Sequence, residues 1–111
     1  MSQFMLLLRD CGHFYSRTPA EMEQIVQEFT AWARKLQAEK RLVEANPLAN
    51  TGRIVTADGD RIIETPFDGG DNMIGGFFLI EVDDYSQATA VARDCPGLKW
   101  GESVEVREIG H

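Results

Sequence analysis

Few side chains in this chain could transfer a proton or hold a ligand by charge. His13 is the only histidine away from the C-terminus, and it lies in a polar segment beside Asp10 and Cys11. An imidazole titrates near neutral pH, so His13 is the candidate general base or ligand anchor. The alternative is a solvated loop histidine. The two-residue spacing of Cys11 and His13 gives no reason for thiol and imidazole to meet, so no nucleophilic pair is predicted.

The second group of candidates lies near Pro66. Glu64 follows two isoleucines and shortly precedes this rigid proline, which predicts a carboxylate held at the end of a strand. Phe67 offers an apolar wall. His13, Glu64 and Phe67 are therefore predicted to line a ligand cleft beside the first helix, with His13 and Glu64 as the candidates for acid–base catalysis.

Neither a metal site nor a cofactor is predicted. The acids Asp58, Asp60, Asp68 and Asp71 fall in expected turns, where aspartate is favoured for backbone reasons. No spacing matches a calcium loop or a zinc site. The two cysteines are expected to be free thiols, as is usual inside cells.

Length and composition predict one soluble domain covering residues 1–111. The residues are 43% hydrophobic and 26% charged, which is ordinary for a globular protein. The formal charge of −7 and the absence of a dense Lys/Arg patch argue against nucleic-acid binding. No apolar run is long enough for a membrane helix, and the N-terminal apolar run is too short for a signal peptide. A cytoplasmic protein without a membrane partner is expected.

The first half of the chain predicts a strand, a helix and a short strand. Phe4 to Leu8 reads as the first strand. Thr18-Pro19-Ala20-Glu21 supplies an N-cap, a proline at the first helical position and a capping-box glutamate. One apolar stripe then follows helical spacing: Met22, Ile25, Val26, Phe29, Trp32, Ala33 and Leu36. A short strand begins at Leu42, and Pro47 ends it nearby.

The second half begins with a predicted hairpin. Residues 53–56 and 61–64 flank a turn that contains Asp58-Gly59, and Pro66 predicts that the second strand ends at Glu64. Gly75-Gly76 predicts a bulge or a close backbone approach, and a side chain at Gly76 is expected to clash there or against the first helix. The remaining predicted elements are a strand over 76–82, a helix from Asp83 or Asp84 to Cys95, and a strand over 102–109. The apolar run Phe77–Ile80 in the first of these is typical of a strand that is covered on both faces.

This order predicts an α+β fold. It is a ferredoxin-like antiparallel sheet with both helices on one face and an inserted β-hairpin. The second face of the sheet is then left uncovered, and an apolar sheet face must pack against something. A second copy of the chain is the simplest cover, so a homodimer is predicted.

The segment from Glu64 to Val82 resembles the signature of the YCII-related proteins, in the branch called DGPF proteins. There the segment reads Asp-Gly-Pro-Phe, a short polar linker, then Leu-Gly-Gly-Phe and an apolar strand. The positions that fall in register are Pro66, Phe67, Gly75, Gly76 and Phe77. The resemblance covers nearly the whole chain and implies a dimeric α/β-barrel, in which two sheets face each other.

The resemblance also bears on activity. Enzymatic members of the wider group are thought to use a His–Asp pair, with the histidine projecting from the first helix into a cleft beside the sheet. In register, Phe29 stands at that histidine and Glu64 at the aspartate of the motif. A phenyl ring cannot transfer a proton, so this mechanism does not carry over.

Three hypotheses about function follow. The first is a small-molecule binding protein whose cleft lies between the sheet and the helices of a homodimer. The second is a lyase- or isomerase-like enzyme that uses a His/acid pair. The third is a regulatory or assembly module linked to transcription, because genes of the resembling family often lie beside those of alternative sigma factors.

Overall fold

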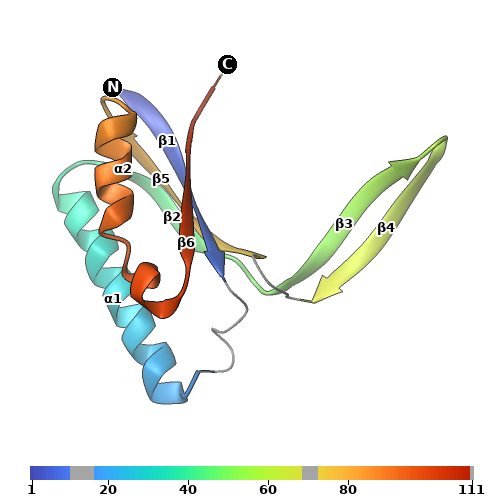
Figure 1. Ribbon diagram of the computed structural model, residues 1–111, viewed down its shortest axis with the longest axis horizontal. Coiled ribbons are helices and arrows are strands. Elements are labelled where there is room, and N and C mark those ends of the chain that lie inside the picture. The colour runs from blue at the N-terminus through green and yellow to red at the C-terminus, as the bar shows by residue number, and fades with distance from the viewer. Residues whose placement is uncertain (11–16, 69–72, 111) are drawn as a thin grey trace.

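The computed structural model describes residues 1–10, 17–68 and 73–110. It is an α+β fold with antiparallel sheets and two α-helices, which fits the ferredoxin-like prediction (Figure 1). No helix in these described ranges is long and apolar enough to cross a membrane. The elements are β1 (Ser2–Asp10), α1 (Pro19–Ala38), β2 (Leu42–Pro47), β3 (Thr51–Asp58), β4 (Arg61–Asp68), β5 (Met73–Val82), α2 (Tyr85–Arg93), the 3₁₀ helix η2 (Pro96–Trp100) and β6 (Ser103–Glu108).

The main sheet has the strand order β2-β5-β1-β6, and α1 and α2 cover one of its faces (Figure 1). Burial alternates along both central strands, so every second residue faces the helices. The prediction that Phe77–Ile80 is covered on both faces is wrong for the single chain. Phe78 and Ile80 are buried, whereas Phe77 and Leu79 lie half-buried on the other face. The core consists of Phe4, Leu6, Leu8, Trp32, Leu36, Phe78, Ile80, Val82, Ala88, Val91, Ala92 and Cys95.

Helix α1 begins as its sequence predicts. The Thr18 side chain accepts a hydrogen bond from the Glu21 backbone N–H at 3.1 Å, and the Glu21 carboxylate accepts one from the Thr18 N–H at 3.0 Å. This capping box satisfies two backbone donors that a helix start otherwise leaves free. The apolar stripe faces the sheet with one exception, because Val26 is 56% exposed. It stands at the rim of a cavity described below.

Replacing Thr18 by alanine is expected to lower the free energy of unfolding by about 1 kcal/mol, because the first turn of α1 loses its cap. Thr30→Ala is the matched control on the same helix, where the hydroxyl only donates to the Val26 carbonyl at 2.8 Å. Urea denaturation of the two variants measures the difference. Equal stability of both would show that the cap contributes nothing here.

The predicted hairpin is present and longer than expected. Gly59 takes a φ of +63° in the turn, which glycine adopts without strain. The prediction that the second strand ends at Glu64 is wrong, because β4 continues to Asp68 with Pro66 paired opposite Arg53. Each strand of a two-stranded ribbon keeps one free edge, where the missing N–H of a proline is tolerated.

Gly75 and Gly76 in β5 form the bulge and the close backbone approach that the sequence predicts. Leu8 pairs with Gly76 and Arg9 with Ile74, so Gly75 is the extra residue of a β-bulge. A Cβ at Gly76 would lie 3.1 Å from the Asn46 carbonyl oxygen. The sequence predicts a clash in the bulge or against the first helix; the close neighbour of Gly76 is instead the backbone of β2.

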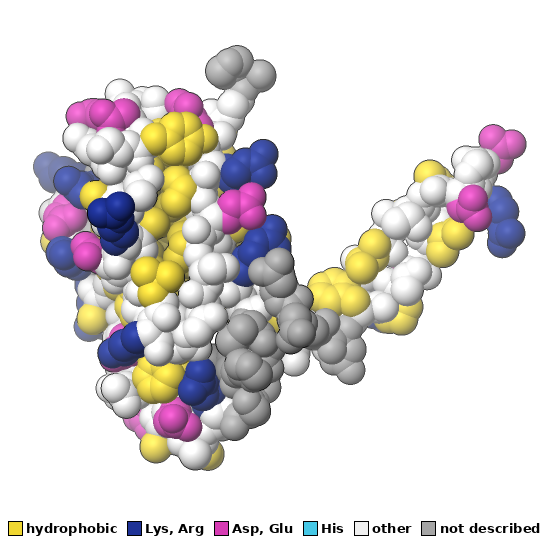
Figure 2. All heavy atoms as spheres, in the orientation of Figure 1, with side chains coloured by type: hydrophobic (Ala, Val, Ile, Leu, Met, Phe, Trp, Pro, Cys, Tyr) yellow, Lys and Arg dark blue, Asp and Glu magenta, His cyan; other side chains and the backbone are white. Residues whose placement is uncertain are grey.

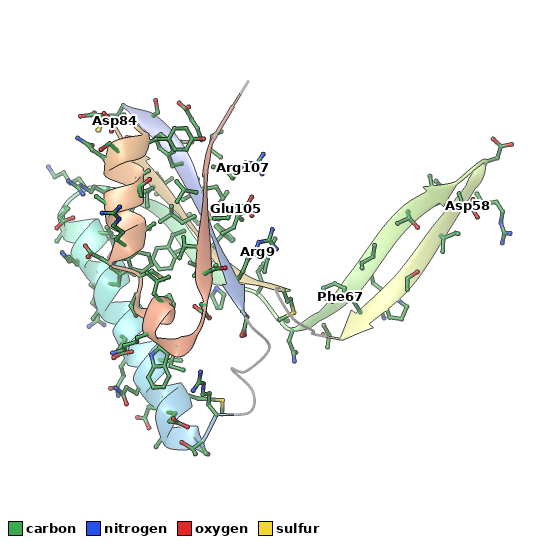
Figure 3. All side chains as sticks on the ribbon, viewed as in Figure 1. Arg9, Asp58, Phe67, Asp84, Glu105 and Arg107 are labelled. Atoms are coloured by element: carbon green, nitrogen blue, oxygen red, sulfur yellow. The ribbon has the colours of Figure 1, made fainter. Side chains whose placement is uncertain are left out.

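The segment after β5 departs slightly from its predicted bounds. Asp84 caps α2 by accepting from the Gln87 N–H at 2.9 Å, as expected (Figure 3). The helix ends at Arg93 instead of reaching Cys95. Pro96 then begins the short helix η2, which leads the chain into β6 at the sheet edge.

Candidate functional site

A cavity of about 360 Å³ lies between α1 and the main sheet. Its wall is largely apolar, and Phe29 and Phe78 form part of it with ring centroids 6.3 Å apart. Two lining residues flank the hairpin, since Leu48 precedes β3 and Met73 begins β5. The lining residues are Leu8, Asp10, Ile25, Val26, Phe29, Thr30, Ala33, Ala45, Asn46, Pro47, Leu48, Met73, Gly75, Gly76, Phe78 and Glu102.

Two carboxylates supply the charge in this apolar space. Asp10 ends β1 and is only 6% exposed. Strand β1 pairs with β6 up to Arg9 opposite Ser103, and one further step of this register brings Asp10 beside Glu102. Both residues fall on the helix-facing side, because they continue the alternation of the buried strand positions. The Glu102 Oε1 atom is buried and has no hydrogen-bond partner among the residues that the structure describes.

The surroundings of Glu102 favour its neutral form. Burial, and then the negative charge of Asp10, raise the pKa of the Glu102 carboxyl to about 7. At neutral pH the group is therefore poised between its acid and its base form. It can donate a hydrogen bond, accept one, or exchange a proton with a molecule in the cavity.

Contacts of η2 with α1 fix the segment that carries Glu102. The Trp100 indole N–H donates to Glu28 Oε1 at 2.9 Å, and Lys99 pairs with the same carboxylate. The Arg17 guanidinium donates to the Trp100 carbonyl at 2.7 Å. The Glu102 N–H donates to the Gly97 carbonyl at 2.9 Å. Helix α1 thus forms one wall of the cavity and, through its contacts with η2, also holds the segment that carries Glu102.

The structure places the sequence-predicted residues elsewhere or does not describe them. His13 and its neighbour Cys11 lie outside the described residues. The Glu64 side chain is 67% exposed on the hairpin and faces Arg53 at 3.6 Å. Phe67 lies at the base of the hairpin over Gly52, away from the cavity lining (Figure 3). Ligand binding by His13, Glu64 and Phe67 stays a prediction.

Sequence reasoning missed both acids of the cavity, although a signal for them existed. Positions 4, 6 and 8 of the first strand and positions 104 and 106 of the last are apolar, so Asp10 and Glu102 continue the inward-facing pattern. A charged residue that extends a buried face by one step is uncommon, because charge is costly to bury. The alternation of inward-facing and outward-facing positions, extended to the ends of both strands, indicates both residues.

The described residues also bear on metal and thiol chemistry. Within residues 1–10, 17–68 and 73–110, no group of three or more His, Cys, Asp or Glu side chains is placed to hold a metal ion. Cys95 is a buried free cysteine, and burial raises the pKa of its thiol to about 11. The thiolate needed for nucleophilic attack is therefore scarce at neutral pH.

The family model of the YCII-related domain matches the sequence over residues 2–110, which is nearly the whole chain. The chain belongs to the YCII-related family. The matched range contains the cavity, both of its acids and the hairpin. A comparison with curated proteins gives no significant match.

One cavity residue bears on the enzymatic pattern that the resemblance implies. Phe29, the residue that the resemblance sets at the helix histidine of that pattern, lines the cavity. A phenyl ring at this position supplies no base. Any proton transfer within the described part of the cavity would fall to Glu102 and Asp10.

Proposed function

We propose that this YCII-related protein binds a small molecule in the cavity between α1 and the sheet. The observation that carries the proposal is the combination of an apolar wall with two carboxyl groups, one of which has a buried oxygen without a hydrogen-bond partner in the described part of the chain. Such a site suits a ligand with an apolar body and one donor or cationic group. Pockets of this kind use apolar area for affinity and a few polar groups for orientation.

Two contributions make this ligand class favourable. An apolar body removes the accessible parts of the apolar wall, such as Val26 and Phe29, from water, which is worth roughly 25 cal/mol per Å² of buried apolar area. A donor at the acid end gives Glu102 Oε1 a hydrogen-bond partner, which none of the described residues supplies. Hydrogen bonds to a charged group are stronger than neutral ones, so an ammonium group suits the Asp10–Glu102 end best.

The probe 2-naphthylmethylamine tests the proposal. It combines an aromatic body with an ammonium group, and its fluorescence is expected to change on binding. Ala33→Phe fills the cavity from α1 and is expected to weaken binding at least about tenfold. Ala31→Phe is the matched control, because Ala31 is exposed on the same helix and does not line the cavity. Equal affinity of both variants, or no binding by the parent, would contradict the proposal.

A neutral analogue separates the two contributions to affinity. The alcohol 2-naphthylmethanol keeps the apolar body and loses the cation, so it is expected to bind the parent more weakly than the amine. The difference should shrink in Glu102→Gln, which keeps the shape of the side chain but removes its charge. Equal binding of amine and alcohol by the parent would assign the affinity to the apolar wall alone.

We also propose that the protein is a homodimer that pairs through the open face of the main sheet. Four half-buried side chains, Met5, Leu7, Phe77 and Leu79, form the centre of this face, where Met5 pairs with Leu79 and Leu7 with Phe77. Beside them, on β1 and β6, an ion-paired group of Arg9, Glu105 and Arg107 faces the same side (Figure 3). An apolar centre with a charged rim is typical of protein interfaces.

A second candidate function is proton transfer of the lyase or isomerase kind. It is favoured by one observation, the Glu102 carboxyl with a pKa near 7 inside a cavity. If substrate screening detects turnover, Glu102→Gln should abolish it while His13→Ala and Glu64→Gln test the residues predicted from sequence. Unchanged turnover in Glu102→Gln would remove this carboxyl from the mechanism. The regulatory role linked to transcription remains a hypothesis that draws on the resemblance alone.

A further inference from the structure

The hairpin β3–β4 stands apart from the rest of the chain. Its strands pair with each other and with no strand of the main sheet. Figures 1 and 2 show it projecting away from the body, with hydrophobic side chains along its length and charged ones at its tip. An isolated two-stranded hairpin is marginally stable at best in water. The hairpin therefore needs a surface against which to pack.

The two faces of the hairpin differ in charge. Direct pairs share a face, so the register assigns Ile54 with Thr65, Thr56 with Ile63 and Gly52 with Phe67 to one face. This face, called the uncharged face below, carries no charge between its base and the Asp58–Arg61 pair at its tip. The opposite face carries Val55, Ala57, Ile62 and Pro66 together with the ion pair Arg53–Glu64.

Several apolar side chains of the hairpin are open to water in the single chain. Ile54 is 48% exposed and Ile63 is 36% exposed on the uncharged face. The Phe67 ring lies over Gly52, where a Cβ would come within 2.6 Å of it, so the absence of a side chain lets this ring flatten against the ribbon. The uncharged face is thus a continuous strip of β-branched and aromatic residues. Such strips mark contact surfaces.

The place of the hairpin indicates its partner. Figure 1 shows the helices on one side of the main sheet and the hairpin extending on the other. The labelled side chains Arg9, Glu105 and Arg107 point toward that same side (Figure 3). The two apolar surfaces that lack a packing partner in the described part of the chain, the open sheet face and the hairpin, therefore border the same space. One body placed there would cover both.

We propose that the uncharged face of the hairpin packs against a second copy of this chain, as an arm that extends the dimer interface. This inference rests on the homodimer proposed above. In a twofold dimer each chain offers the same surface, so both arms are covered at once and no arm is left to recruit further copies. The added area also helps a small domain to reach the roughly 800 Å² per partner of a stable interface.

Neighbouring isoleucines on β4 give a matched pair of variants. Ile63→Lys places a charge on the uncharged face, and Ile62→Lys places the same charge on the opposite face, where the side chain is 72% exposed. Sedimentation equilibrium of the full chain is expected to show that Ile63→Lys weakens dimerisation at least about tenfold, while Ile62→Lys changes it less than about twofold. Ile54→Lys should repeat the effect of Ile63→Lys from β3.

Hydrogen exchange of the parent supplies a measurement that needs no variant. The backbone amides of residues 51–68 are expected to exchange more slowly at concentrations where the dimer forms than at concentrations where it dissociates. A dimer whose hairpin amides exchange equally fast at both concentrations, or equal dimerisation by the Ile62 and Ile63 variants, would overturn the arm and leave the sheet-face dimer standing. A parent that stays monomeric at every concentration would overturn both. The proposal of a ligand in the cavity has its own test, described above, so neither result decides it.

Discussion

Replacing Gly76 by valine is expected to lower the free energy of unfolding by about 3 kcal/mol. The new Cβ would stand 3.1 Å from the Asn46 carbonyl oxygen and 3.4 Å from the Pro47 Cα, and valine adds two more carbons beyond it. Both neighbours are backbone atoms of β2, held by pairing of Pro47 with Gly76. They cannot move away without breaking the strand contact, so the variant must lose pairing or strain it.

Gly75→Ala is the control for this prediction. The adjacent glycine has its nearest neighbour, the Asp10 Cβ, at 3.5 Å, which is an ordinary contact distance. Alanine there should cost less than about 1 kcal/mol. Thermal and urea denaturation of both variants measure the difference. A Gly76→Val protein that melts within about two degrees of the parent would show that β2 yields to the side chain.

The second large effect is a stability difference that depends on pH. The folded state holds the Glu102 pKa near 7, above its ordinary value of 4.5. Ionising this carboxyl in the folded state therefore costs stability. The stability of the folded state has its full value below pH 4.5, falls as the pH rises from 4.5 to about 7, and stays at the lower level above pH 7. Glu102→Gln is expected to remove that loss. It should leave acidic stability nearly unchanged and stabilise the protein in alkaline solution.

The size of this gain is set by solvent access to Glu102. The whole shift would correspond to about 3 kcal/mol, and partial exposure of the side chain reduces this to about 1–2 kcal/mol. Denaturation at about pH 4 and about pH 8 measures it. Glu23→Gln makes the same charge change on the exposed side of α1 and serves as the control. A gain that is equal at both pH values would show that burial of charge is not its source.

Local signals predicted most of the fold. The capping box at Thr18, the Asp58-Gly59 turn and the alternating burial of β1 are each written in a few neighbouring residues. The errors arose where distant segments decide the outcome. Pro66 looks like a strand end in isolation, and only the free edges of a separate ribbon let β4 run through it. The place of the hairpin outside the main sheet could not be read from its own residues.

The candidate site was predicted in position more than in composition. The sequence predicts a cleft beside α1, near the end of β1 and the Glu64–Phe67 turn; the cavity lies beside α1 and Asp10 of β1 lines it, but neither Glu64 nor Phe67 does. The place of Glu64 before the rigid Pro66 is a local signal, whereas the β1–β6 register brings together Asp10 and Glu102 from opposite ends of the chain. The pairing of distant strands determines which acids meet. The alternation of side chains along one strand indicates which face a residue is on, but not which residue of another strand it lies beside.

The hairpin has one consequence for how binding events relate to each other. Leu48 and Met73, which flank it in the chain, are also part of the cavity wall, and the Leu48 N–H is bonded to the bulge residue Gly75 at 2.9 Å. If a second copy holds the arm, the two equilibria share these residues. Thermodynamic linkage then requires reciprocity: the factor by which dimerisation changes ligand affinity equals the factor by which ligand changes the dimerisation constant. Diluting the protein with and without ligand would measure how far the ligand changes the dimerisation constant.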